Sequence, residues 1–366
     1  MFLAHHTLRA TAFVFALLIG ALIFAGFATS FYRQERRSSG ETHYERGQAL
    51  RSGGKPVEAA EEFRKALLFS PDKAEYRVSL GGALIAAGRL NEAQAHLEQL
   101  LQEDPTNGTL NVMLAEVAAR RHQTQQAIDY YHRAVYEYWP AEQAGERRRA
   151  RWELVGLLGQ AGRRNEAVGE LMQLYANAPA DPKIRAKVGF LLLGYGAASE
   201  ASQVFHDLIR DSPQDAQAHK GLAEVDFALG DFRSARHEYQ RASRLSPKDG
   251  QIAEELALTT SVIDVDPGLA DITSGERFRR SGNLLRRVLG DLGGCTVSEN
   301  LQQREDLQQR VDGAEKLLKM KRSAEEDVSL QLQNMSQQLW DDRALFCPQK
   351  PIADRAVEAA LRAIQS

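Results

Sequence analysis

The sequence has little cysteine, few β-branched residues and almost no net charge. Its two cysteines form no CxxC pair, and neither lies near the N-terminus, which excludes a bacterial lipoprotein anchor. The 46 basic and 49 acidic side chains leave a net charge of −3, so nothing indicates a polyanionic partner such as nucleic acid. Abundant Ala, Leu, Glu, Gln and Arg favour helices throughout the 366 residues.

Motifs for catalysis and for metal binding are also missing. The sequence contains no Gly-rich phosphate loop, no HExxH and no GxSxG. The nine histidines are scattered, and the adjacent His5 and His6 would not face one metal ion from a helix. We therefore expect no catalytic residue, no metal and no cofactor, and we predict that the protein is not an enzyme.

One long apolar run lies near the N-terminus. Residues 10–32 carry no charge and would span about 34 Å as a helix, which is enough to cross a bilayer. Arg9 precedes the run and Arg33 follows it. We predict a short tail over residues 1–9 and an uncleaved transmembrane helix or signal anchor over residues 10–32. The alternative is a cleaved signal peptide, with Gly26-Phe27-Ala28 as the cleavage site.

Alanine, proline and glycine recur in phase after this run. The step is 34 residues, except for one step that is six residues longer, and His122 replaces glycine in the third copy. Three residue types in one register indicate an internal repeat. The phased residues are Ala59, Ala93, Ala127, Ala167, Ala201 and Ala235, then Pro71, Pro105, Pro179, Pro213 and Pro247, and the glycines Gly54, Gly88, Gly162, Gly196 and Gly230.

Each residue type suits one position of a helix pair. Glycine ends the first helix in left-handed geometry, alanine lies where two helices cross closely, and proline ends the second helix. This pattern resembles the tetratricopeptide repeat family. The resemblance implies an all-α fold, a right-handed α–α superhelix of helix pairs. It predicts six repeats, over residues 40–73, 74–107, 108–141, 148–181, 182–215 and 216–249.

The family resemblance also implies a binding surface. The first helices of such repeats line a concave groove, which would hold a protein or peptide ligand through apolar anchors and interspersed charges. The alternative for any one of these side chains is that it packs against the next repeat. The implied groove residues are Tyr44, Arg51, Val78, Ile85, Val112, Glu116, Arg120, Trp152, Phe190, Leu193, Lys220, Glu224 and Phe227.

The chain after the repeats is predicted to be helical. We expect a capping helix over residues 250–264 and a helical region over 273–366. Within that region, apolar residues that step by four, three and four predict a hairpin over about 296–346, folded about Lys321. The expected facing pairs are Leu307 with Met335, Val311 with Leu332, and Ala314 with Val328.

The hairpin symmetry brings the two cysteines together. Cys295 then lies opposite Cys347, so we predict a disulfide between them, which requires an oxidising compartment. The alternative is two unrelated buried thiols. An oxidising compartment and an N-terminal apolar segment together predict that the bulk of the chain is periplasmic or otherwise extracytoplasmic.

These features predict a single-pass membrane protein that acts as a scaffold or adaptor, in envelope assembly or biogenesis. One alternative is a cytoplasm-facing adaptor, because more arginines follow the apolar run than precede it. Another alternative is a structural spacer or homo-oligomer organiser that acts through the C-terminal hairpin.

Overall fold

The computed structural model describes residues 23–24, 34–137, 139, 141–177, 181–293, 301–320, 325–346 and 354–365. Over these residues every regular element is a helix and none is a strand, which confirms the predicted all-α class. The chain divides into two compact units, unit 1 (Met1–Glu170) and unit 2 (Leu171–Ser366). The boundary falls within one helix, and each unit is described by itself.

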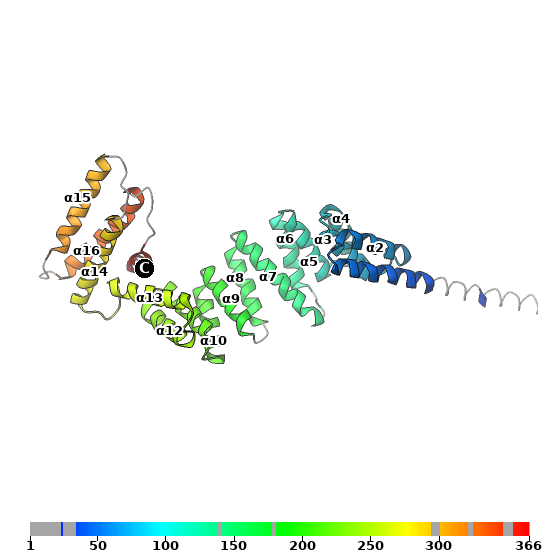
Figure 1. The fold of residues 1–366 in the computed structure, drawn as a ribbon, viewed down its shortest axis with the longest axis horizontal. Coiled ribbons are helices and arrows are strands. Elements are labelled where there is room, and N and C mark those ends of the chain that lie inside the picture. The colour runs from blue at the N-terminus through cyan, green and yellow to red at the C-terminus, as the bar shows by residue number, and fades with distance from the viewer. Residues whose placement is uncertain are drawn as a thin grey trace, which may run out of the picture. The chain divides into compact units, whose positions relative to one another are not determined.

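Unit 1 is a series of helix pairs in which each helix packs on its neighbour in sequence (Figure 1). The first helix covers residues 34–52. The others are α2 (Pro56–Phe69), α3 (Ala74–Ala86), α4 (Leu90–Glu103), α5 (Gly108–Arg120), α6 (Thr124–Tyr136), the 3₁₀ helix η1 (Ala141–Gln143), α7 (Ala144–Gln160) and the start of α8 (Arg164–Ala176).

Unit 2 continues with helix pairs and ends in a helical bundle. The first helices of successive pairs contact each other, as α3 and α5 also do in unit 1. The helices are the end of α8, then α9 (Pro182–Gly194), α10 (Ala198–Asp211), α11 (Ala216–Ala228), α12 (Phe232–Leu245), α13 (Gly250–Val265), α14 (Ser274–Gly293), α15 (Leu301–Leu318), α16 (Glu325–Phe346) and α17 (Arg355–Gln365).

The turn within each pair has the backbone that the glycines predict. Gly88, for example, has φ of +74°, a left-handed conformation that a side chain disfavours. The other four phased glycines also have positive φ. His122, which replaces glycine, takes the same geometry with φ of 59°, so this turn keeps its shape at some cost in strain.

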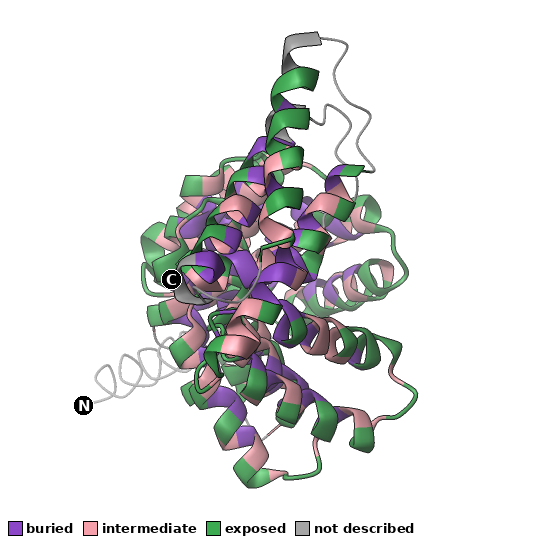
Figure 2. Ribbon diagram, turned by 90° about the vertical axis from the view of Figure 1, so that its left-hand side faces the viewer, coloured by how far each residue is buried: buried purple, intermediate pink, exposed green. Residues whose placement is uncertain are grey.

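Close helix crossings require the small residues. A Cβ placed on Gly81 would lie 2.7 Å from Leu97, and one on Gly189 would lie 2.7 Å from Phe205. Gly221 is tighter still, at 2.1 Å from the same phenyl ring, and the ring of Phe205 is fully buried. Figure 2 shows the consequence, with buried residues along one side of the helices and exposed residues along the other.

The C-terminal helices share one core with the last repeat. Apolar side chains of α12, α13, α14, α16 and α17 form a single buried cluster, which includes Phe232, Leu284, Leu332 and Val357. As the hairpin prediction requires, α15 and α16 pack against each other. However, α16 also packs along α14, where Gln333 donates a hydrogen bond to Ser281.

The register of α15 against α16 differs from the predicted symmetry. Arg310 pairs with Asp342, further toward the end of α16 than folding about Lys321 would place it. A Cβ on Gly313 would lie 4.0 Å from Met335 Cε, so Met335 lies beside Gly313 of α15. Because α16 packs against α14 as well as against α15, the contacts between α15 and α16 alone do not determine how these two helices align.

Two predictions concern residues that the structure does not describe. No helix in the described part of the chain is both long and apolar enough to cross a membrane. The predicted transmembrane segment over residues 10–32 lies outside that part, apart from Ile23 and Phe24. Cys295 and Cys347 also lie outside it, so the disulfide stays a prediction.

Candidate protein-binding surface

In unit 1, the candidate groove residues on α3 and α5 form a mixed polar and apolar surface. Val78 and Val112 are half-buried, and the side chains of Glu116 and Arg120 are partly exposed. Arg120 Nη2 lies 2.6 Å from Glu116 Oε1, and Nη1 donates to the carbonyl oxygen of Ile85 at 2.9 Å. Arg120 therefore links two neighbouring first helices while its charge still faces solvent.

Other candidates in unit 1 are less accessible. Ile85 is only 3 % exposed and belongs to the buried core of unit 1, so it packs inside the array. Tyr44 is 9 % exposed, and its hydroxyl donates to Glu75 Oε1 at 2.6 Å. Burial, and then the bond to Glu75, raise the pKa of Tyr44. Arg51 on the helix over residues 34–52 is exposed, and Trp152 on α7 is half-buried.

In unit 2 the candidates converge around one aromatic ring. Phe190 of α9 is half-buried, and Lys220 Nζ of α11 lies 5.7 Å from the centroid of its ring, a cation–π contact. Lys220 Nζ also donates to Gln251 at 2.9 Å and lies 3.6 Å from Glu224. Burial raises the pKa of Glu224, and Lys220 opposes this shift. Leu193 and Phe227 are half-buried on the same two helices.

A cavity of about 710 Å³ lies beside Phe190, between the starts of α9 and α11. Asp181 begins α9 by accepting a hydrogen bond from the backbone N–H of Lys183 at 2.9 Å, and Asp215 begins α11 by accepting from Gln217 at 2.8 Å. The residues that line the cavity are Asp181, Pro182, Lys183, Ala186, Lys187, Phe190, Leu191, Asp215 and Gln217.

The lining combines apolar and charged side chains. Ala186, Phe190 and Leu191 supply apolar surface, and Lys183 and Lys187 supply basic groups. The two aspartates already accept backbone hydrogen bonds at the helix starts. The arrangement suits a side chain that is apolar and is flanked by an acidic group.

Of the cavity residues, only Phe190 was expected from the sequence. Lys183, Ala186 and Lys187 precede it on the same helix at spacings of seven, four and three, so they share its face. Extending the repeat register by one turn toward the start of α9 would have found them. Metal chemistry has no support in the described residues, where no three His, Cys, Asp or Glu side chains are grouped to hold an ion.

Comparison with known sequences gives partial matches. The human protein O-mannosyl-transferase TMTC1 is 26 % identical over 217 residues, which are 58 % of this chain and 24 % of that protein. The cellulose synthase 1 operon protein C of Komagataeibacter xylinus is 23 % identical over 222 residues, or 54 % of this chain and 16 % of that protein. The chain thus spans a quarter or less of the length of these curated relatives.

Solved structures with similar helices include YrrB, described as a tetratricopeptide repeat protein with an unusual peptide-binding site. It is 18 % identical, covers 54 % of this chain and 98 % of its own, and has a TM-score of 0.41. The pilF protein of Pseudomonas aeruginosa is 17 % identical over 61 % of this chain and 99 % of its own, with a TM-score of 0.40.

A family model described as a tetratricopeptide repeat matches residues 50–100, 84–138 and 192–258. These matches fall on helix pairs with the phased turn glycines described above. Residues 50–138 and 192–258 thus match the tetratricopeptide repeat model, and they fold as the helix pairs that such repeats form.

Proposed function

We propose that the chain is a membrane-anchored scaffold that binds other proteins through the first helices of its repeats. The observation that carries the proposal is the cavity beside Phe190, which is open, largely apolar at its floor and lined by Lys183 and Lys187. Repeat arrays of this kind present extended surfaces and do not enclose a desolvated polar pocket, so the proposal includes no catalytic step.

The ligand that best fits this cavity is a peptide segment with a large apolar side chain next to Asp or Glu. The apolar side chain would contact Phe190 and Ala186, and the carboxylate would contact a lysine ammonium group. Such contacts account for a scaffold that selects partners by a short motif.

Substitution at Phe190 tests this proposal. Phe190→Asp in the full-length chain places a like charge at the site of the partner's carboxylate and removes the aromatic anchor. We expect the recovery of co-purified partners, measured by quantitative mass spectrometry, to fall at least about tenfold. The matched control is Leu229→Asp, at a residue that is 64 % exposed in the turn between α11 and α12. Equal recovery with both variants would contradict the proposal.

The anchoring part of the proposal rests on the uncharged run over residues 10–32. Its length and flanking arginines suit an uncleaved membrane-spanning helix. Carbonate extraction of native membranes tests it, because an integral protein stays in the pellet. Release of the intact chain into the supernatant, or an N-terminus that begins after Ala28, would argue against the anchor.

We also propose that the bulk of the chain lies outside the cytoplasm and that Cys295 and Cys347 form a disulfide. The support is that the two cysteines flank the α15–α16 hairpin in the sequence, one before α15 and one after α16. Thiol labelling of protein from the native host tests this: we expect no free thiol before reduction and two after it. Two free thiols before reduction would favour the cytoplasm-facing adaptor.

A second function, self-association through the C-terminal helices, is favoured by one observation. An open cavity of about 480 Å³ lies between α14 and α15, with Leu289, Leu292, Leu307 and Val311 on its walls. Sedimentation of the full-length chain in detergent distinguishes the two functions. A dimer that Leu292→Arg disrupts would support self-association, and a monomer at micromolar concentration would exclude it.

A further inference from the structure

The second helix of the last repeat, α12, carries basic side chains along its exposed side. Arg233, Arg241 and Arg244 are exposed, as is Lys248 just after the helix, and Arg236 is half-buried. At about 100° per residue, Arg233 and Arg244 lie within about 20° of each other around the axis. From Arg233 to Arg244 the helix rises about 16 Å. We call these five residues the α12 basic face.

The opposite side of α12 is fully used in packing. Phe232, Ala235, Tyr239 and Ala242 are buried against α11 and α13. No apolar side chain of α12 is therefore left to insert into a bilayer, except for Leu245 at its end, which is 39 % exposed. The two aromatic rings of the helix are also buried, so they cannot stack on nucleic-acid bases.

The α12 basic face has no ion pair with any carboxylate of the described residues. Other exposed arginines of unit 2 do pair with carboxylates, as Arg210 does with Asp207 at 2.6 Å and Arg355 with Glu255 at 3.0 Å. Acidic residues are therefore available in unit 2, but none of the described ones pairs with the α12 basic face.

The acidic residues nearest in sequence are committed to other groups. Asp231 and Asp249 each cap a helix, by accepting hydrogen bonds from Ser234 N at 3.1 Å and Gln251 N at 3.0 Å. Glu238, the single carboxylate within α12, contacts His219 Nδ1 at 2.6 Å and His237 Nδ1 at 2.9 Å. The arginine charges thus remain available to a partner.

We propose that the α12 basic face binds an acidic polypeptide segment of a partner protein, at a surface separate from the first-helix cavity. Guanidinium groups match carboxylates through paired hydrogen bonds, which a point charge does not do. The four arginines of α12 are three, five and three residues apart, so their helical rises are about 4.5, 7.5 and 4.5 Å. These rises are of the same order as the roughly 7 Å between alternate side chains of an extended chain, so an acidic strand along α12 can contact more than one arginine.

Binding of a fluorescent oligo-glutamate peptide to the full-length chain in neutral detergent tests this proposal. We expect saturable binding that weakens as salt is added, because the contacts are exposed ion pairs. The double variant Arg241→Glu, Arg244→Glu should weaken binding at least about tenfold, since it replaces two attractions by two repulsions. Fluorescence anisotropy measures both effects.

The matched control reverses two charges in another basic run. Arg148→Glu with Arg149→Glu in α7 gives the same change in net charge, and Arg149 is already paired with Glu146 at 2.9 Å. We expect this control to bind the peptide as the unchanged chain does. Equal weakening by both double variants, or no binding at all, would overturn the proposal.

Two further measurements separate the alternatives. Thermal unfolding by circular dichroism should give nearly the same midpoint for the α12 variant and the unchanged chain. Arg241 and Arg244 are exposed and form no ion pair within the described residues, and only Arg244 lies in the last turn of α12, where a basic side chain is favourable. A fall in midpoint that matches the loss of binding would overturn the proposal. Micelles containing phosphatidylglycerol serve as a competitor. If they bind more tightly than the peptide and depend on the same arginines, the partner is a lipid surface and the proposal fails.

Discussion

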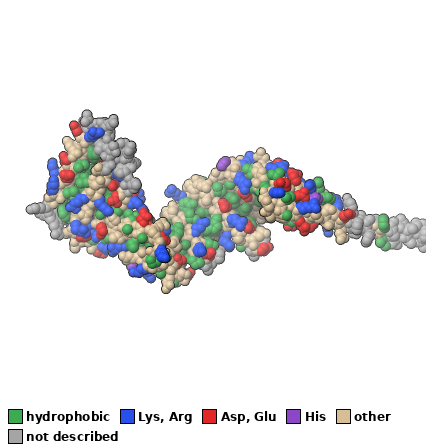
Figure 3. Space-filling view, viewed as in Figure 1, with side chains coloured by type: hydrophobic (Ala, Val, Ile, Leu, Met, Phe, Trp, Pro, Cys, Tyr) green, Lys and Arg blue, Asp and Glu red, His purple; other side chains and the backbone are tan. Residues whose placement is uncertain are grey.

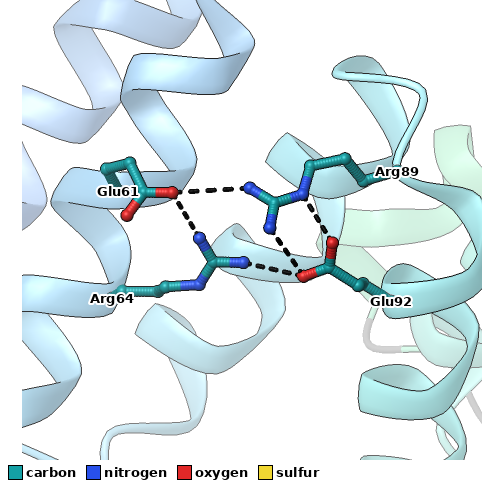
Figure 4. Close-up of polar contacts among 4 residues, drawn as sticks. All are labelled: Glu61, Arg64, Arg89 and Glu92. Carbon is teal, nitrogen blue, oxygen red and sulfur yellow. Dashed lines mark hydrogen bonds and ion pairs between the residues drawn. The ribbon is translucent and has the colours of Figure 1, made fainter.

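Charged side chains on the second helices are used differently in the two units. In unit 1, Glu61 and Arg64 of α2 meet Arg89 and Glu92 at the start of α4 in a closed ring of four (Figure 4). Acidic and basic side chains are interspersed over this part of the surface (Figure 3). In unit 2, the α12 basic face has no such partners.

The difference shows that similar repeats can use arginine for two purposes. In unit 1, the arginines cross-link one second helix to the next: Arg64 Nη2 lies 2.9 Å from Glu92 and Arg89 Nη1 lies 3.4 Å from Glu61. The arginines of α12 also lie on a second helix, but the neighbouring carboxylates are used elsewhere. Asp231 and Asp249 cap helices, and Glu238 contacts His219. Charge on a repeat therefore indicates a binding surface only where its internal partners are missing.

The largest expected effect comes from the buried ion pair of unit 1. Arg151 Nε lies 3.0 Å from Glu170 Oε2, and both side chains are less than 10 % exposed. Tyr136 also donates to Glu170 at 2.7 Å. Glu170→Gln would leave the guanidinium buried without its counter-charge, so we expect the free energy of unfolding to fall by about 3–5 kcal/mol in urea titrations.

A control in the same helix sharpens this result. Glu166 pairs with Arg163 at 2.6 Å, but its side chain is 49 % exposed. Glu166→Gln should lower the free energy of unfolding much less than Glu170→Gln does, because solvent screens the exposed pair. If Glu166→Gln and Glu170→Gln were equally destabilising, burial would not explain why an ion pair stabilises unit 1.

The contribution of the buried Glu238–His219 pair of unit 2 to stability should depend on pH. Burial raises the pKa of Glu238, but hydrogen bonds from His219 and His237 outweigh this and leave the pKa below its usual value. A carboxyl group with a lowered pKa stabilises the fold when the pH is above its ordinary pKa of about 4.5. This stabilisation is lost as the pH falls below that value. We expect Glu238→Gln to lower the free energy of unfolding by about 1–2 kcal/mol near neutral pH and less near pH 4. A loss that is independent of pH would contradict this assignment.

Asp226 has a raised pKa, so its contribution to stability should change with pH in the opposite direction. Burial, and then Asp231 and Glu238, raise the pKa of Asp226 to about 6. Its raised pKa stabilises the fold below the ordinary value of 3.8, and that contribution disappears as the pH rises through about 6. Asp226→Asn should therefore raise the free energy of unfolding by about 1 kcal/mol near pH 8, relative to the unchanged chain, and leave it unchanged near pH 3. Urea titrations at both pH values measure the difference.

The smallest expected effect is the coupling within the ring of Figure 4. A double-mutant cycle with Glu61→Gln and Arg89→Gln should give a coupling far smaller than the effect of Glu170→Gln. The coupling should also shrink in high salt, because these side chains are 52 % and 33 % exposed. A coupling as large as the effect of Glu170→Gln would mean that surface arginines in unit 1 stabilise the fold as strongly as the buried pair does.

Much of the repeat fold could be predicted from the sequence because its determinants are local. The turn glycines and His122 fix the backbone between paired helices, and Gly81 and Gly189 mark close crossings. These constraints act within one repeat and recur at a fixed spacing, so the sequence displays them directly.

The candidate site and the C-terminal bundle could be predicted only in part. Ile85 has the same register as exposed groove positions, yet the neighbouring helices bury it. The cavity beside Phe190 depends on the space between two helix starts, which no single-helix pattern reveals. The α15–α16 register depends on α14 as a third partner, so symmetry between two helices did not determine it.

Above all, we propose that partners bind to the first-helix face of unit 2. A photo-crosslinking amino acid at position 190, in the full-length chain in its native host, tests this binding, with position 199 on the exposed side of α10 as the comparison. We expect a discrete protein adduct at 190 that is absent at 199 and is lost when Lys187→Glu is added. No adduct at 190, or the same adduct at both positions, would show that partners do not bind at this face.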